Sequence, residues 1–135
     1  MNIKISETRS IDEEQILELY RANEWSAVSK PSELRSGLLN SHSLISAWDG
    51  DKLVGIGNAI SDGYLVVYYP HLLVHPAYQG KGIGKMICDK FQEKYKGFHM
   101  QMLTADGKAI EFYEKVGFEK AGKTVPMWIY NGNEH

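Results

Sequence analysis

The chain has 135 residues, 43% of them hydrophobic and 24% charged, with a formal net charge of −2. That length predicts a single domain, residues 1–135, with a real hydrophobic core. The slight negative charge argues against nucleic-acid or anionic-membrane partners, and no apolar run approaches the roughly 20 residues that span a bilayer. One cysteine, Cys88, excludes an internal disulfide. The single cysteine and the lack of a signal-peptide pattern at the N-terminus together predict a cytoplasmic protein.

The first half of the chain predicts one strand, two helices and a hairpin. Residues 2–6 alternate as a short strand, and a capping-box pattern at Ser10–Glu13 opens a helix over residues 11–23. Pro31 suits the first turn of a second helix. Strands are expected over residues 43–48 and 53–60, joined by the Asp49-Gly50 turn.

The second half predicts a longer strand, two helices and further strands. Pro70 lies within the strand over residues 64–74 and predicts a bulge, because proline cannot donate to a strand ladder. Ile83, Ile87 and Phe91 form one buried stripe on a helix over residues 82–96. The remaining elements are a strand at 98–103, a helix at 108–116 capped by Asp106, and strands at 118–121 and 127–130. This order indicates a mixed α/β sheet with at least one crossover.

A glycine-spaced loop follows the strand that ends at Val74. Gly80, Gly82 and Gly84 alternate with other residues just where a helix begins. Uncovered backbone N–H groups and the helix N-terminus make such a loop suited to a phosphate or pyrophosphate. A dinucleotide fold would place its glycines after the first strand, and a P-loop would need G-x-x-x-x-G-K-[ST], which is absent.

Two motifs give this loop a family resemblance that covers nearly the whole chain. Residues 74–84 resemble the acyl-CoA motif of the GNAT N-acyltransferase superfamily, Gln/Arg-x-x-Gly-x-Gly/Ala. Residues 106–118 look like that family's second signature, Asn-x-x-Ala-x-x-Phe-Tyr followed by Gly-Phe. The resemblance implies a mostly antiparallel mixed sheet of six to seven strands with splayed central strands, about four helices, and acetyl-CoA as co-substrate.

The same resemblance implies where acetyl-CoA binds. The backbone before the loop would pair with the pantetheine arm, and the loop would hold the pyrophosphate. Asp106 stands where the family usually has Asn, and a carboxylate cannot donate a hydrogen bond as an amide does. The implied cofactor-binding residues are Leu72, Leu73, Val74, Gln79, Gly80, Lys81, Gly82, Ile83, Gly84, Lys85, Asp106 and Ala109.

The chemistry implied by the resemblance centres on Tyr113, as the general acid that protonates the departing CoA thiolate. An oxyanion-hole N–H is expected in the segment from Leu72 to Val74. His71 is the candidate base or member of a water relay, because its reference pKa near 6.5 suits that task. His71 and His75 are four residues apart with no evident third ligand, so no metal is predicted.

The acceptor is a small-molecule or peptide amine whose class the sequence leaves open. Candidate substrate-binding residues are Trp25, Tyr68 and Trp128, and an aromatic-rich pocket favours an apolar or aromatic amine. Residues 60–63, 78–84, 111–113 and 126–130 are also similar to plant and cyanobacterial serotonin-type arylalkylamine N-acetyltransferases. Polyamines, aminoglycosides, amino acids and protein amines stay open as acceptors.

Two other classes compete with the enzyme. One is a non-catalytic acyl-CoA-binding or sensor domain on the same fold, and Tyr113 favours the enzyme over it. The other is a nucleotide-binding module of another class. A homodimer is possible, since dimers are common in the family that the sequence resembles.

Overall fold

The structure, a computed structural model, describes residues 2–132. Its sheet has the order β1-β2-β3-β4-β5, antiparallel throughout except for the parallel β4–β5 pair. The strands are β1 (Ile3–Ser6), β2 (Ser43–Asp49), β3 (Lys52–Ser61), β4 (Val66–Val74) and β5 (Met100–Met102). The helices are α1 (Glu13–Ala22), α2 (Pro31–Leu39), α3 (Ile83–Lys94) and α4 (Ala109–Lys115), with 3₁₀ helices η1 (Ser26–Ser29) and η2 (Pro76–Tyr78).

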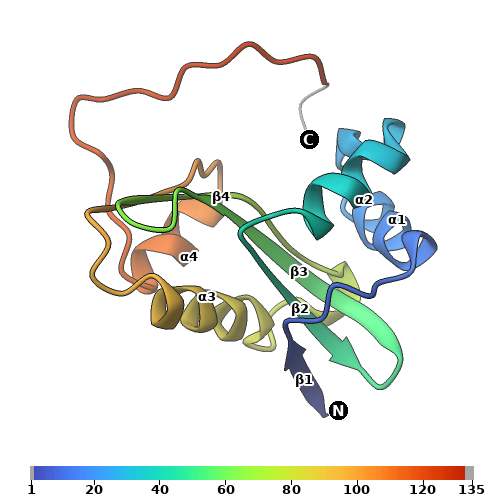
Figure 1. The fold of residues 1–135 in the computed structure, drawn as a ribbon. Coiled ribbons are helices and arrows are strands. Elements are labelled where there is room, and N and C mark those ends of the chain that lie inside the picture. Colours follow the sequence, from blue (N-terminus) through green and yellow to red (C-terminus); the bar gives the residue numbers. More distant parts are fainter. Residues whose placement is uncertain (1, 133–135) are drawn as a thin grey trace.

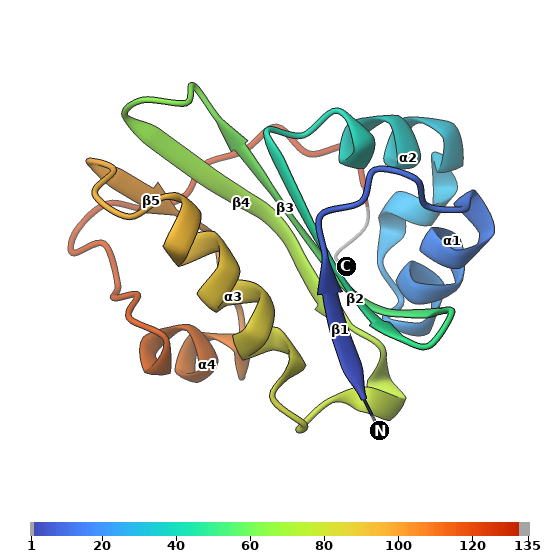
Figure 2. The same cartoon turned by 60° about the horizontal axis from the view of Figure 1, so that its bottom comes forward.

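Helices cover both faces of the sheet. α1 and α2 lie on one face, and α3 and α4 lie on the other (Figures 1 and 2). The central strands therefore bury side chains on both faces, with Leu44 and Ile56 in the core under α1 and α2, and Ile45 and Val54 in the core under α3. The parallel β4–β5 pair, joined through α3, is the crossover that the sequence predicts.

The close fit of α3 on the sheet depends on glycine in β3. The predicted stripe of Ile83, Ile87 and Phe91 is buried, as expected. A Cβ on Gly57 would lie 2.9 Å from Cε2 of Phe91, and one on Gly55 would lie 3.2 Å from Ile83 and from Ile87. Both distances are shorter than ordinary contact, so α3 can sit where it does only because these positions lack a side chain.

The bulge predicted at Pro70 is present in β4. Asn58 of β3 pairs with His71, and Ile60 pairs with Tyr68, so β4 has one residue more than β3 in this interval. The extra residue leaves the proline, which lacks an N–H, outside the regular ladder. The bulge therefore confirms the reading of Pro70 as a break in the pairing of β4.

The predicted number of strands is wrong for the described residues. The sheet has five strands, and neither residues 118–121 nor residues 127–130 form one. Gly122, with a φ of 67°, and Pro126 interrupt this part of the chain. A strand forms only where a neighbour takes up its backbone hydrogen bonds, and residues 119–132 pair with no strand of the sheet.

Both predicted helix caps are also wrong. Asp12, not Ser10, is the N-cap of α1, and its side chain makes no capping hydrogen bond. The N-cap of α4 is Lys108, because the chain turns at Gly107 (φ 54°) after Asp106. Asp106 contributes its carbonyl oxygen, which accepts from the N–H of Ala109 at 3.1 Å.

Candidate active site

The second half of β4 offers backbone groups that β3 does not use. The N–H of His71 donates to Oδ1 of Asn58 (3.1 Å), and the N–H of His75 donates to the carbonyl of Val54 (2.8 Å). Alternate residues of a strand bond to opposite sides, so the backbone groups of Leu72 and Val74 face away from β3, while those of Leu73 face it. β5 pairs with β4 only from Val66 to Tyr68. Because β5 ends at Met102, no strand within residues 2–132 pairs with Leu72 or Val74 on that side.

The glycine loop lies between this strand and α3. Gly80 and Gly82 have φ values of 78° and 84°, and Gly82 is the N-cap of α3. A Cβ at either position would meet no atom within 4 Å, so the glycines serve the backbone conformation and leave the loop open. Gln79 is exposed, and its side-chain amide donates to the carbonyl of Val74 at 3.0 Å.

Gly84 has a different role from the other two glycines. A Cβ there would lie 3.2 Å from Cζ of Phe112 on α4. Its bare backbone thus allows the first turn of α3 to pack closely against α4. This contact joins the two sequence motifs and fixes Tyr113, the next residue on α4, relative to the loop.

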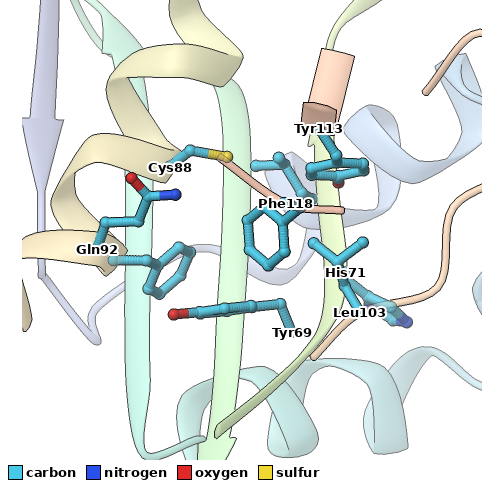
Figure 3. A pocket seen from close by; sticks show the side chains of 9 residues that line it. Tyr69, His71, Cys88, Gln92, Leu103, Tyr113 and Phe118 are labelled. Carbon is cyan, nitrogen blue, oxygen red and sulfur yellow. The ribbon is translucent and has the colours of Figure 1, made fainter. Parts of the chain in front are cut away.

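Tyr113 lines a pocket between α3, α4 and β4. The space between its lining residues is about 280 Å³, a volume that includes open solvent. Figure 3 shows the Cys88 thiol pointing toward Tyr113 and Phe118, above Tyr69 of β4. The lining residues are Tyr69, His71, Leu72, Cys88, Phe91, Gln92, Leu103, Tyr113 and Phe118.

Burial controls protonation in this pocket. Desolvation raises the pKa of the Tyr113 hydroxyl above its ordinary value, with a smaller contribution from Cys88. Desolvation also raises the pKa of the Cys88 thiol to about 12. Cys88 is therefore a neutral thiol at physiological pH and not an activated nucleophile.

Although His71 also lines this pocket, its ring packs against Tyr20 of α1 in an aromatic cluster on the opposite face of the sheet. The hydroxyl of Tyr20 lies 2.8 Å from Nδ1 of His71. Trp25 stands edge-on to both rings, with centroids 5.7 Å from Tyr20 and 5.0 Å from His71. Tyr20 is fully buried, and desolvation raises its pKa. These residues come from α1, the turn after it and β4.

The other predicted substrate residues lie outside this cluster. Tyr68 is exposed near the β5 end of β4, and Tyr69 is buried under α3, where its hydroxyl donates to Oε1 of Gln101 at 2.7 Å. Trp128 lies in the segment after α4 and stacks on Tyr130. The hydroxyl of Tyr130 meets Oγ of Ser26 at 3.0 Å, one residue from Trp25.

Sequence reasoning missed the polar support beneath His71. Asn58 is buried and donates from Nδ2 to Oγ of Ser41 at 2.9 Å, while its Oδ1 receives the N–H of His71. It also missed the close approach of α3 at Gly57. Glycines inside a strand pattern were the available signal for that approach, whereas a lone asparagine gave none.

Comparison with known proteins assigns a class to this fold and site. The acetyltransferase (GNAT) domain family matches residues 7–127, and the chain belongs to that family. It is thus a GNAT N-acetyltransferase by family and fold, and acetyl-CoA is the family's co-substrate.

Individual relatives agree with this assignment. The chain is 27% identical over 135 residues to an uncharacterized ycf52-like N-acetyltransferase of Prochlorococcus marinus, covering 93% of this chain and 74% of the relative. A GNAT-family acetyltransferase structure from Streptococcus pneumoniae has a TM-score of 0.82 and 29% identity, covering 96% of this chain and 99% of that one.

A structure of AAC(6')-Iy in complex with the bisubstrate analogue CoA-S-monomethyl-acetylneamine shares the fold alone. Its TM-score is 0.73 at 14% identity, covering 96% of this chain and 99% of that one.

Residues 2–132 contain neither a cluster of metal-ligating side chains nor a membrane-spanning helix. Between residues 2 and 132, no group of three or more His, Cys, Asp or Glu side chains is placed to hold a metal ion. Within the same range, no helix has the length and apolar character needed to cross a membrane.

Proposed function

We propose that this protein transfers the acetyl group of acetyl-CoA to a primary amine by direct attack in a ternary complex. The observation that carries the proposal is one pocket lined by both Tyr113 of α4 and Leu72 of β4. Tyr113 belongs to the second sequence motif, Leu72 lies just before the first, and the packing of Gly84 on Phe112 joins the two motifs. The cytoplasmic location stays a prediction.

Acetyl-CoA fits the open edge and loop described above. The backbone of Leu72 and the N–H of Val74 are available to the pantetheine arm, because β5 ends at Met102, while the carbonyl of Val74 accepts from Gln79. Gly80, Gly82 and the first turn of α3 supply N–H groups for the pyrophosphate. The thioester supplies an activated acetyl group. Lys81, Ile83 and Lys85 of the loop, Leu73 of the strand, and Asp106 and Ala109 at the start of α4 remain predicted contacts.

Tyr113 is the proposed general acid for the departing thiolate. Its raised pKa keeps the hydroxyl protonated, so a proton is available when the thiolate leaves. A thiol in the same surroundings is also a weaker acid, since burial raises the pKa of Cys88 to about 12. The thiolate is thus a stronger base here than in water. The pKa of the desolvated tyrosine therefore stays close to that of the thiol to which it gives its proton.

His71 is proposed to act at the acceptor amine. Tyr20 is buried, and the one described acceptor for its hydroxyl hydrogen is Nδ1 of His71. The neutral imidazole then has its hydrogen on Nε2. Of the two predicted roles, this arrangement favours the water relay, in which Nε2–H orients a water that receives the ammonium proton.

The aromatic cluster favours an aromatic or other apolar amine as the acceptor. Trp25 and His71 offer ring faces and edges beside the proposed relay. Trp128 joins this acceptor side if the segment after α4 stays near Ser26, where Tyr130 is hydrogen-bonded. AAC(6')-Iy, a protein of the same fold, was solved with an acetylneamine analogue, so aminoglycosides belong in the test.

A thiol-release assay tests the proposal. Acetyl-CoA is supplied with arylalkylamines, polyamines, aminoglycosides or peptides, and we expect release with the arylalkylamines. Tyr113→Phe should lower kcat by about 10²–10⁴-fold with little change in acetyl-CoA affinity. Tyr64→Phe, at an exposed turn, is the matched control. Binding of acetyl-CoA in calorimetry without turnover of any amine would support the sensor alternative instead.

A further inference from the structure

The glycine loop before α3 forms no backbone hydrogen bonds of its own. Gly80, Lys81 and Gly82 are exposed, and within residues 2–132 their N–H groups donate to no other residue. Such groups are available to a phosphate, but little within the loop fixes its conformation, and ordering it on binding costs entropy. Its shape therefore depends on what holds its two ends. The far end is the first turn of α3, where the N–H of Met86 donates to the carbonyl of Gly82 at 3.0 Å.

Tyr78 ties the near end of the loop to the turn between β2 and β3. It is the last residue of η2, directly before Gln79, and its hydroxyl donates to Oδ2 of Asp49 at 2.6 Å. Nζ of Lys52 lies 5.7 Å from the centroid of the same ring, a cation–π contact. Asp49 and Lys52 pair with each other at the end of the β2–β3 ladder. Two charged groups of one hairpin therefore hold the side chain of Tyr78.

The hydrogen bond from Tyr78 to Asp49 is of the strong, charge-assisted kind. Its length is typical of a hydroxyl that donates to a carboxylate. The bond raises the pKa of the Tyr78 hydroxyl, because ionisation would remove the donor and place a second negative charge beside Asp49. The ring itself is half-buried and packs against the core under α3. Tyr78 is therefore fixed both by packing and by a hydrogen bond that persists at physiological pH.

We propose that Tyr78 is a positioning residue for acetyl-CoA, whose hydrogen bond to Asp49 sets the glycine loop in the conformation that receives the pyrophosphate. This role rests on the proposed function, because it takes acetyl-CoA as the ligand of the loop. Tyr78 acts through the backbone of Gln79 and Gly80, the residues that follow it. The side chain of Gln79 is a second tether, through its hydrogen bond to the carbonyl of Val74. A loop that is held in its bound form before the ligand arrives loses less entropy on binding, so affinity rises.

The positioning role predicts a loss of affinity confined to a donor that carries the pyrophosphate. S-acetylpantetheine has the thioester and the pantetheine arm of acetyl-CoA but lacks the pyrophosphate and the nucleotide. Tyr78→Phe keeps the packed ring and removes only the hydroxyl. We expect its Kd for acetyl-CoA to rise roughly tenfold, the effect of one hydrogen bond to a charged group, with kcat unchanged. Its Kd for S-acetylpantetheine should equal that of the wild type. Calorimetry measures both Kd values, and thiol release with an arylalkylamine measures kcat.

Matched variants separate positioning from a general loss of stability. Tyr95→Phe also removes a hydrogen-bonded phenol, which lies 2.6 Å from Nδ1 of His42, but at the opposite end of α3 from the loop. It should leave both Kd values unchanged. Asp49→Ala should match Tyr78→Phe, and the double variant should bind no more weakly than either single one, because all three lack the same bond. Asp49→Asn keeps an oxygen that accepts from the phenol, so it should retain most of the affinity.

The outcomes distinguish a failure of this role from a failure of the proposed function. A wild type that binds neither donor would overturn both. If the wild type binds acetyl-CoA and Tyr78→Phe binds it equally tightly, Tyr78 has no positioning role, although the proposed function stands. The same holds if Tyr78→Phe weakens the binding of both donors by the same factor, or lowers kcat at an unchanged Kd. Far-UV circular dichroism of each variant checks that folded proteins are being compared.

Discussion

The hydrogen bond between Tyr20 and His71 makes a specific prediction about where His71 has its proton. The fully buried Tyr20 hydroxyl lies 2.8 Å from Nδ1 of His71, and we assign this ring nitrogen as the acceptor of the phenol hydrogen. The neutral His71 ring should therefore be the Nε2–H tautomer. Tyr20→Phe removes the one oxygen responsible and keeps the ring that packs against Trp25.

The expected cost follows from the burial of the contact. Tyr20→Phe removes the hydrogen bond to His71, and a bond of this kind contributes about 0.5–1.5 kcal/mol to the unfolding free energy. The ring of His71 also loses the contact that fixes its orientation at the acceptor side. If that orientation contributes the same order of energy in the transition state, kcat/KM falls roughly tenfold, equivalent to about 1.4 kcal/mol.

Nitrogen-15 NMR of the imidazole rings reads the tautomer directly. We expect the Nε2–H form for His71 in the wild type and a mixture of tautomers in Tyr20→Phe, with urea unfolding and thiol-release kinetics measured on the same samples. Tyr64→Phe should leave all three readouts unchanged, since Tyr64 is exposed. An Nδ1–H ring in the wild type would refute the direction of the hydrogen bond and, with it, the water-relay role of His71.

Two further predictions concern stability. Gly57→Ala should lower the unfolding free energy by about 1–3 kcal/mol, because its Cβ would lie 2.9 Å from Phe91. Gly37→Ala, in open space on α2, should be neutral or stabilising by up to about 1 kcal/mol in the same denaturant titration, and equal effects would refute the packing argument. The raised pKa values of Tyr20 and Tyr113 mean that the folded state holds these protons more tightly than the unfolded chain does. The contribution of these two tyrosines to the unfolding free energy should therefore stay level below the reference tyrosine pKa of about 10 and fall as pH rises above it. Tyr20→Phe should reduce the decrease of the unfolding free energy at alkaline pH. An unchanged dependence of that free energy on pH would contradict a raised pKa for Tyr20.

Local patterns in the sequence predicted most of the fold, because each depends on residues near one another in the chain. The stripe of Ile83, Ile87 and Phe91 predicted α3, and Pro70 predicted the bulge in β4. The prediction of strands at residues 118–121 and 127–130 was wrong for a physical reason. Residues 127–130 have the composition of a strand, but a strand also needs a neighbour, and its neighbour is not encoded locally.

The candidate site, too, was predictable only where its residues lie close together in the sequence. Two motifs predicted Tyr113 and the loop from Gly80 to Gly84, and the structure brings the two motifs together through Phe112. The support of His71 by Tyr20 and Asn58 spans separations of 51 and 13 residues along the chain. No local pattern encodes contacts at those separations, so only the folded chain reveals them.

The bulge at Pro70 connects the two sides of the site. Before it, Val67 and Tyr69 face the core under α3, whereas after it the residues two apart, His71 and Leu73, face α1. One extra residue in a strand reverses the face of every side chain that follows. Without it, His71 would point toward α3 and could not reach Tyr20. The reversal also turns Leu72 and Val74 toward the core under α3, on the side where Tyr113 lies. A single proline thus allows consecutive residues of one strand to serve the acetyl donor on one face and the amine acceptor on the other.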